Sequence, residues 1–217
     1  MIGKTWLPIH KAPGPSARQP WYCQRMTRVL SVDPSLTSTG LCRVDLIPRP
    51  TSSEPRGDNE PVRAEILLHA VKSKPTADKS YAAMSRRIEK IADTVRAAMD
   101  GCDLIVIEGP SFGSKGQHTH SRDWLWGKIF DAARVNWGIP VLVVTPSQRM
   151  KYATGKGNAQ KDAVLAAAIK RWPDVEIDGN DQADALILAA IGCRSLGCPI
   201  DAVPASHFEP VMAKLAA

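Results

Sequence analysis

The sequence predicts an α/β protein with a mixed five-stranded sheet flanked by helices. Three strand-like segments come first, at 28–33, 40–47 and 62–71, and helical and strand-like segments alternate thereafter. The segment DLIVIEG at 103–109 is continuously apolar, which is typical of a parallel strand buried on both faces. Neighbouring strands followed by alternating helices and strands favour a sheet with both antiparallel and parallel pairs.

The first half of the chain shows strand periodicity. RVLSVD (28–33) is apolar-rich and ends on Asp33, where a turn of small residues begins. GLCRVDLI (40–47) alternates and predicts the second strand of a hairpin. The polar, proline-punctuated stretch at 48–61 is typical of a mobile loop. VRAEILLHAV (62–71) then predicts the third strand.

The first helix is predicted from Ser80 to Met99. Met84, Ile88, Ile91 and Val95 recur every three or four residues. This spacing places their side chains on one face of a helix, so that face is expected to pack on the sheet.

The remaining elements complete the order β-β-β-α-β-α-β-α-α. A helix is expected at 124–137 and the last strand at 139–146. A second pair of helices is expected at 158–172 and 181–193, and Asn158 is placed to cap the first of them.

Length and composition predict one folded domain with appendages. The chain has 217 residues, of which 44% are hydrophobic, as in globular proteins. Residues 1–27 are rich in Pro, Gly and basic residues and predict a flexible extension, 28–199 the globular domain, and 200–217 a C-terminal tail.

Charge and cysteine content narrow the function classes. The net charge of +6 and pI near 9.2 permit nucleic-acid binding without showing it. No apolar run approaches the ~18 residues of a membrane span, and the N-terminus does not resemble a signal peptide. The five cysteines form no CxxC pair and are odd in number, which favours reduced thiols and a cytoplasmic location.

Acidic residues occupy positions where a ligand site is expected. Asp33 and Glu108 each end an apolar strand, and ligand sites in α/β sheets collect at the carboxyl ends of strands. Asp181 and Asp184 share one helix face, which Leu188 continues toward the sheet. Like charges there would repel each other and would lose hydration, and a pair of Mg²⁺ ions removes both problems.

Each acid also has a simpler interpretation. Asp33 suits a turn, Glu108 before Gly-Pro suits a solvated strand end, and Asp181 suits the positive end of a helix dipole. The occurrence of all four acids on these particular elements favours a shared metal site.

Four motifs resemble the RuvC family of Holliday-junction resolvases. VLSVDPSLTSTG is similar to the first-strand motif of that family, and DLIVIEGPSFGSK to its glutamate motif. TPSQRMKYATGKGNAQK is similar to the stretch before the penultimate helix, and DQADALILAA to the closing acidic motif. The four motifs match the order and spacing of the family from about Arg28 to Cys193. Their residues are more similar to those of phage or prophage relatives.

The resemblance implies an RNase H-like (RuvC-type) fold and a homodimer that cuts four-way DNA junctions in DNA recombination and repair. It implies two Mg²⁺ ions, which Mn²⁺ can replace. The implied catalytic and metal-binding residues are Asp33, Glu108, Asp181 and Asp184. The resemblance also implies DNA contacts by Phe112, Lys151 and Lys161. Position adds Lys115, in the loop after Glu108, and Lys156, before the helix at 158–172, as expected phosphate contacts.

Two further groups of residues surround the expected site. Lys115, His118, His120 and Arg122 are expected in the loop after the glutamate, where a histidine could assist proton transfer or simply be a surface residue. The helix at 124–137 has more than one apolar face, contributed by Trp124, Trp126, Phe130 and Trp137, and is the expected dimer surface.

Other functions remain open at this point. An actin-like ATPase or sugar kinase would need a second phosphate-binding turn, and the sequence has no second copy. A non-catalytic junction-binding protein would be expected to lack at least one of the four acids. A nuclease for forks, flaps or RNA would keep the same acids, because such a protein reads backbone shape rather than bases.

Overall fold

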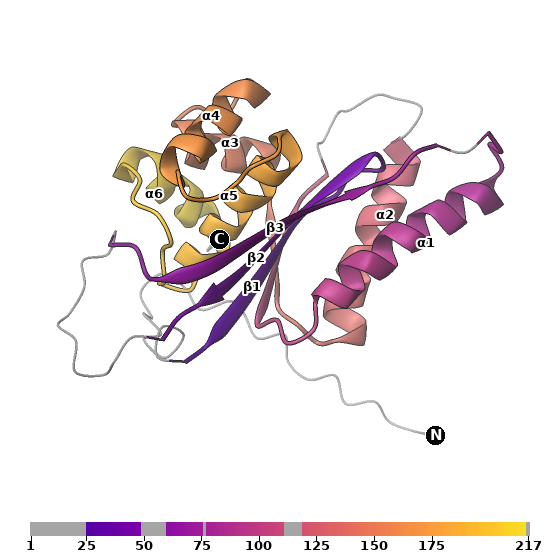
Figure 1. Ribbon diagram of the computed structural model, residues 1–217, viewed down its shortest axis with the longest axis horizontal. Coiled ribbons are helices and arrows are strands. Elements are labelled where there is room, and N and C mark those ends of the chain that lie inside the picture. Colours follow the sequence, from indigo (N-terminus) through magenta and orange to yellow (C-terminus); the bar gives the residue numbers. More distant parts are fainter. Residues whose placement is uncertain (1–24, 49–59, 76, 111–118, 216–217) are drawn as a thin grey trace.

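The structure is a computed structural model that describes residues 25–48, 60–75, 77–110 and 119–215. A single twisted sheet separates two layers of helices (Figure 1). Helices α1 and α2 cover one face, and α3, α4, α5 and α6 gather on the other.

The sheet is mixed and five-stranded, as predicted. Its strands are β1 (Thr27–Asp33), β2 (Ser38–Leu46), β3 (Ala64–Lys72), β4 (Leu104–Glu108) and β5 (Val141–Val144). Their order across the sheet is β3-β2-β1-β4-β5. The first three strands pair antiparallel, whereas β4 runs parallel to both β1 and β5.

The helices follow the strands as the chain crosses from one layer to the other. They are α1 (Tyr81–Ala98), α2 (Thr119–Asp131), a π-helical turn (Ala132–Asn136), α3 (Pro146–Thr154), α4 (Lys161–Arg171), α5 (Asn180–Ser195) and α6 (Ala205–Leu215). Ser80 caps α1 by accepting a hydrogen bond from the amide of Ala83, so the predicted start of that helix is confirmed.

Alternation along the strands divides the core in two. Val29 of β1 belongs to the cluster under α5, and Leu30 and Val32 belong to the cluster under α1 and α2. Strand β4 is buried on both faces, because Val106 contributes to the first cluster and Ile105 to the second. The continuously apolar sequence of β4 follows from this double burial.

Helix α5 lies against the middle of the sheet and is almost entirely buried. The Ser31 hydroxyl donates to the carbonyl oxygen of Ala185 over 2.6 Å, which fixes the helix along β1. Gly192 permits a close approach, because a Cβ there would lie 2.4 Å from a methyl group of Val106. Small residues at both contacts therefore set how closely α5 packs on the sheet.

Two helix boundaries differ from the prediction. Helix α2 begins at Thr119, not at 124, so His120 and Arg122 lie in its first turn and not in a loop. Helix α4 begins at Lys161 after Gln160 as N-cap, and the proposed capping by Asn158 is wrong. The extended conformation of Gln160 places the N-cap of α4 two residues beyond Asn158.

Two helices were not predicted at all. Helix α3 is specified by a capping box between Thr145 and Gln148, with Pro146 at its first position. Helix α6 (Ala205–Leu215) occupies most of 200–217, so the description of this segment as a tail is wrong. Phe208 and Val211 of α6 pack into the core because they recur at helical spacing.

A buried polar network holds this second layer together. The Tyr152 hydroxyl of α3 donates to the Asp201 carboxylate over 2.7 Å, and Arg194 of α5 donates to the same carboxylate over 3.2 Å. Arg171 of α4 reaches the other oxygen of Asp201 over 3.1 Å. Asp201 thereby joins α3, α4 and α5.

The thiols differ in state. Cys42, Cys102 and Cys193 are free, and burial raises the pKa of the Cys102 thiol to about 12. Cys198 is disulfide-bonded, so the expectation of reduced cysteines throughout is wrong at this position.

Among the described residues, no helix is long and apolar enough to cross a membrane. The predicted extension at 1–27 lies almost wholly, and the loop at 48–61 mostly, outside the described residues.

Candidate active site at the carboxyl edge of the sheet

Two of the predicted acids leave the sheet side by side. Asp33 is the last residue of β1, and Glu108 is the last residue of the neighbouring parallel strand β4. Val32 pairs with Ile107, so the next residue of each strand is an acid at the same level. The parallel pairing therefore brings together two carboxylates that are 75 positions apart in the sequence.

The first turn of α5 brings the other two acids to the same edge. Gly40 of β2 lies opposite Asp33 in the sheet. A Cβ on Gly40 would lie 2.0 Å from the backbone oxygen of Asp181, so only glycine lets the helix approach this closely. Asp181 is half-buried and Asp184 is buried one turn further along.

Arg149 of α3 lies among these acids and was missed by the sequence analysis. Its Nε donates to the Glu108 carboxylate and its Nη1 donates to the Asp184 carboxylate. The side chain of Arg149 is only 9% exposed, and those of Glu108 and Asp184 are 14% and 7% exposed. A buried guanidinium thus bridges a strand end and a helix start.

The pKa shifts show how closely the charges interact. Burial, with Glu108 as the second cause, raises the pKa of Asp33 to about 7, while Arg149 opposes the shift. Burial raises the pKa of Asp184 to about 7 as well, again against Arg149. Burial also raises the pKa of Glu108. The charge of Arg149 therefore offsets only part of the effect of burial on these carboxylates.

The donor set suits a hard divalent cation, although the present arrangement pairs it with arginine. Carboxylate oxygens are the ligands that Mg²⁺ prefers. Within the described part of the chain, no three His, Cys, Asp or Glu side chains are arranged to hold a metal ion. Arg149 accounts for this, because it takes one oxygen each from Glu108 and Asp184. The carboxylates of Asp33, Glu108, Asp181 and Asp184 suit a divalent cation by their chemistry, and in this structure Arg149 pairs with two of them.

The predicted basic residues have different surroundings. Lys161 begins α4, is exposed, and its charge lowers the pKa of both Asp33 and Asp184, which places it near the acids. Lys156 is exposed in the loop before α4. Lys151 instead donates to the carbonyl oxygen of Gly155 over 2.7 Å and stabilises the end of α3. Phe112 and Lys115 lie outside the described residues.

Arg122, in the first turn of α2, also acts on the site. Its charge opposes the burial effect on the pKa of Glu108. His120 is exposed in the same turn. The start of α2 therefore adds positive charge beside the strand end that carries Glu108.

Two of the aromatic residues of α2 support the site. The indole nitrogen of Trp126 donates to the backbone oxygen of Glu108 over 2.9 Å, and its ring stacks on Phe130 at 5.0 Å. Both residues are half-buried in the single chain. Trp126 holds the end of β4 in place.

Fold and site together define an α/β domain with a mixed five-stranded sheet and a carboxylate cluster at the carboxyl edge of that sheet. The chain is 29% identical to a crossover junction endodeoxyribonuclease RuvC of Paenarthrobacter aurescens (strain TC1) over 75% of its length and 78% of the relative. It is 26% identical to the RuvC of Synechococcus sp. (strain CC9311) over 76% of its length and 97% of the relative. No family model matches the sequence.

Solved structures agree with the fold. RuvC of Thermus thermophilus superposes with a TM-score of 0.59 at 20% identity, covering 81% of this chain and 99% of that one. The same protein in complex with a Holliday-junction substrate superposes with a TM-score of 0.56 at 18% identity over the same shares of both chains. The fold is RuvC-type, and the resemblance to the RuvC family is confirmed.

Proposed function

We propose that this protein is an endonuclease that resolves four-way (Holliday) DNA junctions by paired phosphodiester cleavage. The observation that carries the proposal is the meeting of Asp33, Glu108, Asp181 and Asp184 at one sheet edge of a RuvC-type fold. The two relatives are named crossover junction endodeoxyribonucleases, and the superposed complex contains a Holliday junction. A role in DNA recombination and repair follows from this activity, and the cytoplasm is its proposed location.

The acids would hold two Mg²⁺ ions, which Mn²⁺ can replace. Bound there, such ions supply an activated water and stabilise the leaving oxygen of a phosphodiester. The residues of the chain position these groups: β1 and β4 fix Asp33 and Glu108 at one level, and the contact at Gly40 fixes the start of α5.

The cations around the acids orient the substrate. Lys161 stands at the exposed start of α4, where helix dipole and ammonium both attract a phosphate. Arg149 holds Glu108 and Asp184 in place while they are otherwise unneutralised. Without that guanidinium, carboxylates packed at this edge would repel one another.

A protein that binds junctions without cutting them is the second candidate. The hydrogen bonds of Arg149 to Glu108 and Asp184 favour this second candidate, because they occupy carboxylate oxygens that a metal ion would need. All four acids are retained, and this favours the nuclease.

One gel decides between these functions. Purified protein is incubated with end-labelled four-way junction, fork, flap and linear duplex, with and without Mg²⁺. We expect paired nicks in the four-way junction only when Mg²⁺ is present. Retardation of the junction without nicks at any Mg²⁺ or Mn²⁺ concentration would establish the binding protein, and cutting of forks or flaps alone would change the substrate class.

Phosphate contacts by Lys156 and Lys161 give a first quantitative prediction. Replacing either by Ala should weaken DNA binding independently of sequence and reduce the salt slope of log K by roughly 0.9 per lost contact. Lys170→Ala, at the far end of α4, is the matched control and should leave the slope unchanged. Equal slopes for all three variants and wild type would make Lys156 and Lys161 ordinary surface residues.

The proposed homodimer supplies the second active site. A four-way junction has two equivalent strands to cut, and one chain carries one set of acids, so a two-fold dimer is needed. The surface around α2 and the π-helical turn exposes large apolar residues: Trp124 is 37%, Val135 is 74% and Trp137 is 48% exposed. Trp124 and Trp137 belong to the expected dimer surface, and Val135 extends it.

Charged substitutions test this dimer. Light scattering of the wild type should give twice the chain mass of 23.5 kDa, and Val135→Glu or Trp137→Glu should yield monomers that nick junctions singly. Ile169→Glu, on an exposed apolar residue of α4, is the control and should remain dimeric. A wild type that stays monomeric on a junction would exclude paired incision.

A further inference from the structure

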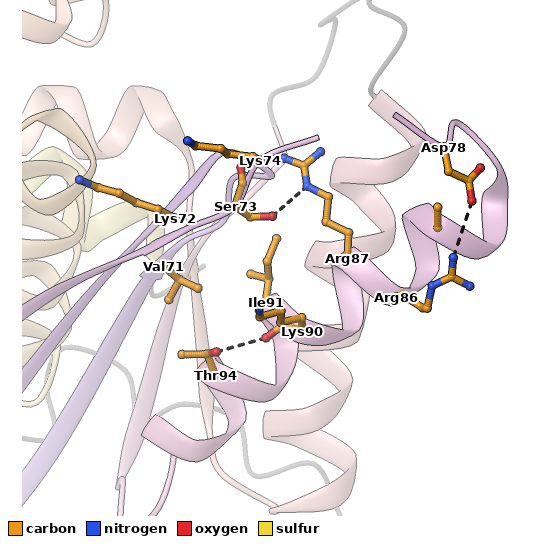
Figure 2. A pocket seen from close by; sticks show the side chains of 11 residues that line it. Val71, Lys72, Ser73, Lys74, Asp78, Arg86, Arg87, Lys90, Ile91 and Thr94 are labelled. Carbon is orange, nitrogen blue, oxygen red and sulfur yellow. Dashed lines mark hydrogen bonds and ion pairs between the residues drawn. The ribbon is translucent and has the colours of Figure 1, made fainter. Parts of the chain in front are cut away.

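A basic pocket lies between the end of β3 and helix α1, apart from the acidic site. Its volume is about 440 Å³, and its floor includes the apolar side chains of Val71 and Ile91. Its rim carries five basic residues, Lys72, Lys74, Arg86, Arg87 and Lys90, and one acidic residue, Asp78. Figure 2 shows Lys72 and Lys74 on the strand end and Arg86, Arg87 and Lys90 on α1, with the two strand lysines extending away from the helix.

Arg87 has a structural role in this pocket. Its Nη2 donates to the carbonyl oxygens of Leu36 and Ser73, and its Nε donates to the Ser73 hydroxyl over 2.9 Å. In Figure 2 its guanidinium turns toward Ser73. Leu36 belongs to the turn that follows Asp33, so Arg87 ties the pocket to the loop that leaves the acidic site.

The lysines of the pocket remain available to a ligand. Lys72, Lys74 and Lys90 are exposed. Within the described residues, none of their ammonium groups forms an ion pair, whereas Arg86 lies 3.7 Å from the Asp78 carboxylate. The pocket thus carries an excess of positive charge.

The pocket and the acidic site share one edge of the sheet. Asp33 pairs with Gly40, which pairs with Ala70, and Lys72 lies two residues beyond Ala70. Lys72 lies two strands across the sheet and two residues along the strand from Asp33. With about 4.8 Å between strands and about 3.3 Å per residue, the Cα atoms of Lys72 and Asp33 are about 12 Å apart. With a rise of about 3.4 Å per nucleotide, this corresponds to about three or four nucleotides.

We infer that this pocket binds the phosphodiester backbone of the DNA strand three or four nucleotides from the phosphate held at the acidic site. The inference rests on the proposed function for the position of the strand. Exposed lysines around an apolar floor suit a run of phosphates, because they act as adjustable point charges and read no sequence. Arg87 links this contact to the turn after Asp33, so a bound strand is aligned with the acids.

The test is DNA binding in EDTA, where cleavage plays no part. The pocket variant Lys72→Gln/Lys74→Gln/Lys90→Gln is compared with a control variant, Arg63→Gln/Lys170→Gln/Lys214→Gln. The control residues are exposed and remove the same charge, and Arg63 lies beyond the opposite end of β3. The pocket variant should lower the salt slope by about 2 to 3 relative to the control, or about 0.9 per contact. Equal slopes for the two variants would overturn the inference.

A neutral-phosphate scan locates the contact. Junctions carrying one methylphosphonate at successive positions from the cleaved or bound phosphate are titrated with wild type and pocket variant. Wild-type affinity should fall most at the third or fourth nucleotide, and the pocket variant should be insensitive there. An equal loss in both proteins at that position would place the contact elsewhere.

The proposed function fails separately from this inference. If the two triple variants differ in salt slope but the wild type never cuts junctions with Mg²⁺, the inference about the pocket stands and the proposed nuclease function fails. If the wild type cuts junctions but the two triple variants have equal salt slopes, the proposed nuclease function stands and the inference about the pocket fails.

Discussion

Asp33→Asn is expected to reduce cleavage of a four-way junction by about 10²–10³-fold or more, the loss seen when one group that stabilises a transition state is removed. Asp33 lies between β4 and α5, next to Glu108 and Asp181, and the amide cannot carry the negative charge that a divalent cation requires. The measurement is single-turnover cleavage with excess protein at saturating Mg²⁺. Glu108→Gln, Asp181→Asn and Asp184→Asn should behave alike.

Binding provides the contrast in this experiment. Removing one negative charge beside a phosphate should leave junction affinity unchanged or increase it. Asp174→Asn changes an exposed acid after α4 and should cut like the wild type. Normal cutting by both Asp181→Asn and Asp184→Asn would show that the site assignment is wrong.

Arg149→Gln is expected to destabilise the metal-free protein by about 3–5 kcal/mol, the range found when one partner of a buried ion pair is removed. The change leaves Glu108 and Asp184 buried without a counter-charge. The measurement is urea unfolding in EDTA. Arg86→Gln removes a solvent-exposed pair with Asp78, whose side chains are 72% and 55% exposed, and should leave the free energy of unfolding nearly unchanged.

Two further measurements connect Arg149 to the acids. In the double variant Arg149→Gln/Glu108→Gln, the loss should be smaller than the sum of the single losses, because both changes remove the same interaction. Mg²⁺ should raise the melting temperature of Arg149→Gln more than that of the wild type, because its carboxylates no longer have a competing cation. Additive losses and equal Mg²⁺ responses would show that Arg149 only fills space.

Composition and spacing did not predict the disulfide of Cys198 or the polar network around Asp201. An odd number of cysteines without a CxxC pair predicted reduced thiols, yet Cys198 is disulfide-bonded. Bond formation depends on which residues the fold brings together, and sequence spacing does not contain that information. Asp201, expected in a tail, instead joins three helices.

Hydrophobic periodicity by itself predicted the sheet, and the positions of the four acids at the ends of strands and on one helix face predicted the candidate site. Hydrophobic patterns are local, so the strands ending at Asp33 and Glu108 and the helix face carrying Asp181 and Asp184 followed from neighbouring residues alone. The capping box of Thr145 and Gln148 was also a local signal for α3, and it was overlooked.

Only the tertiary structure decided what surrounds these acids. Arg149 meets Glu108 and Asp184 across 41 and 35 positions, and this contact depends on how α3 packs over the sheet edge. A deficit of positive charge among four neighbouring acids pointed to a missing cation but not to its position. The basic pocket arises in the same way, because Arg87 reaches Leu36 across 51 positions only when α1 lies against the end of β3. Long-range packing brings such residues together, and a periodic pattern records only which face of an element is buried.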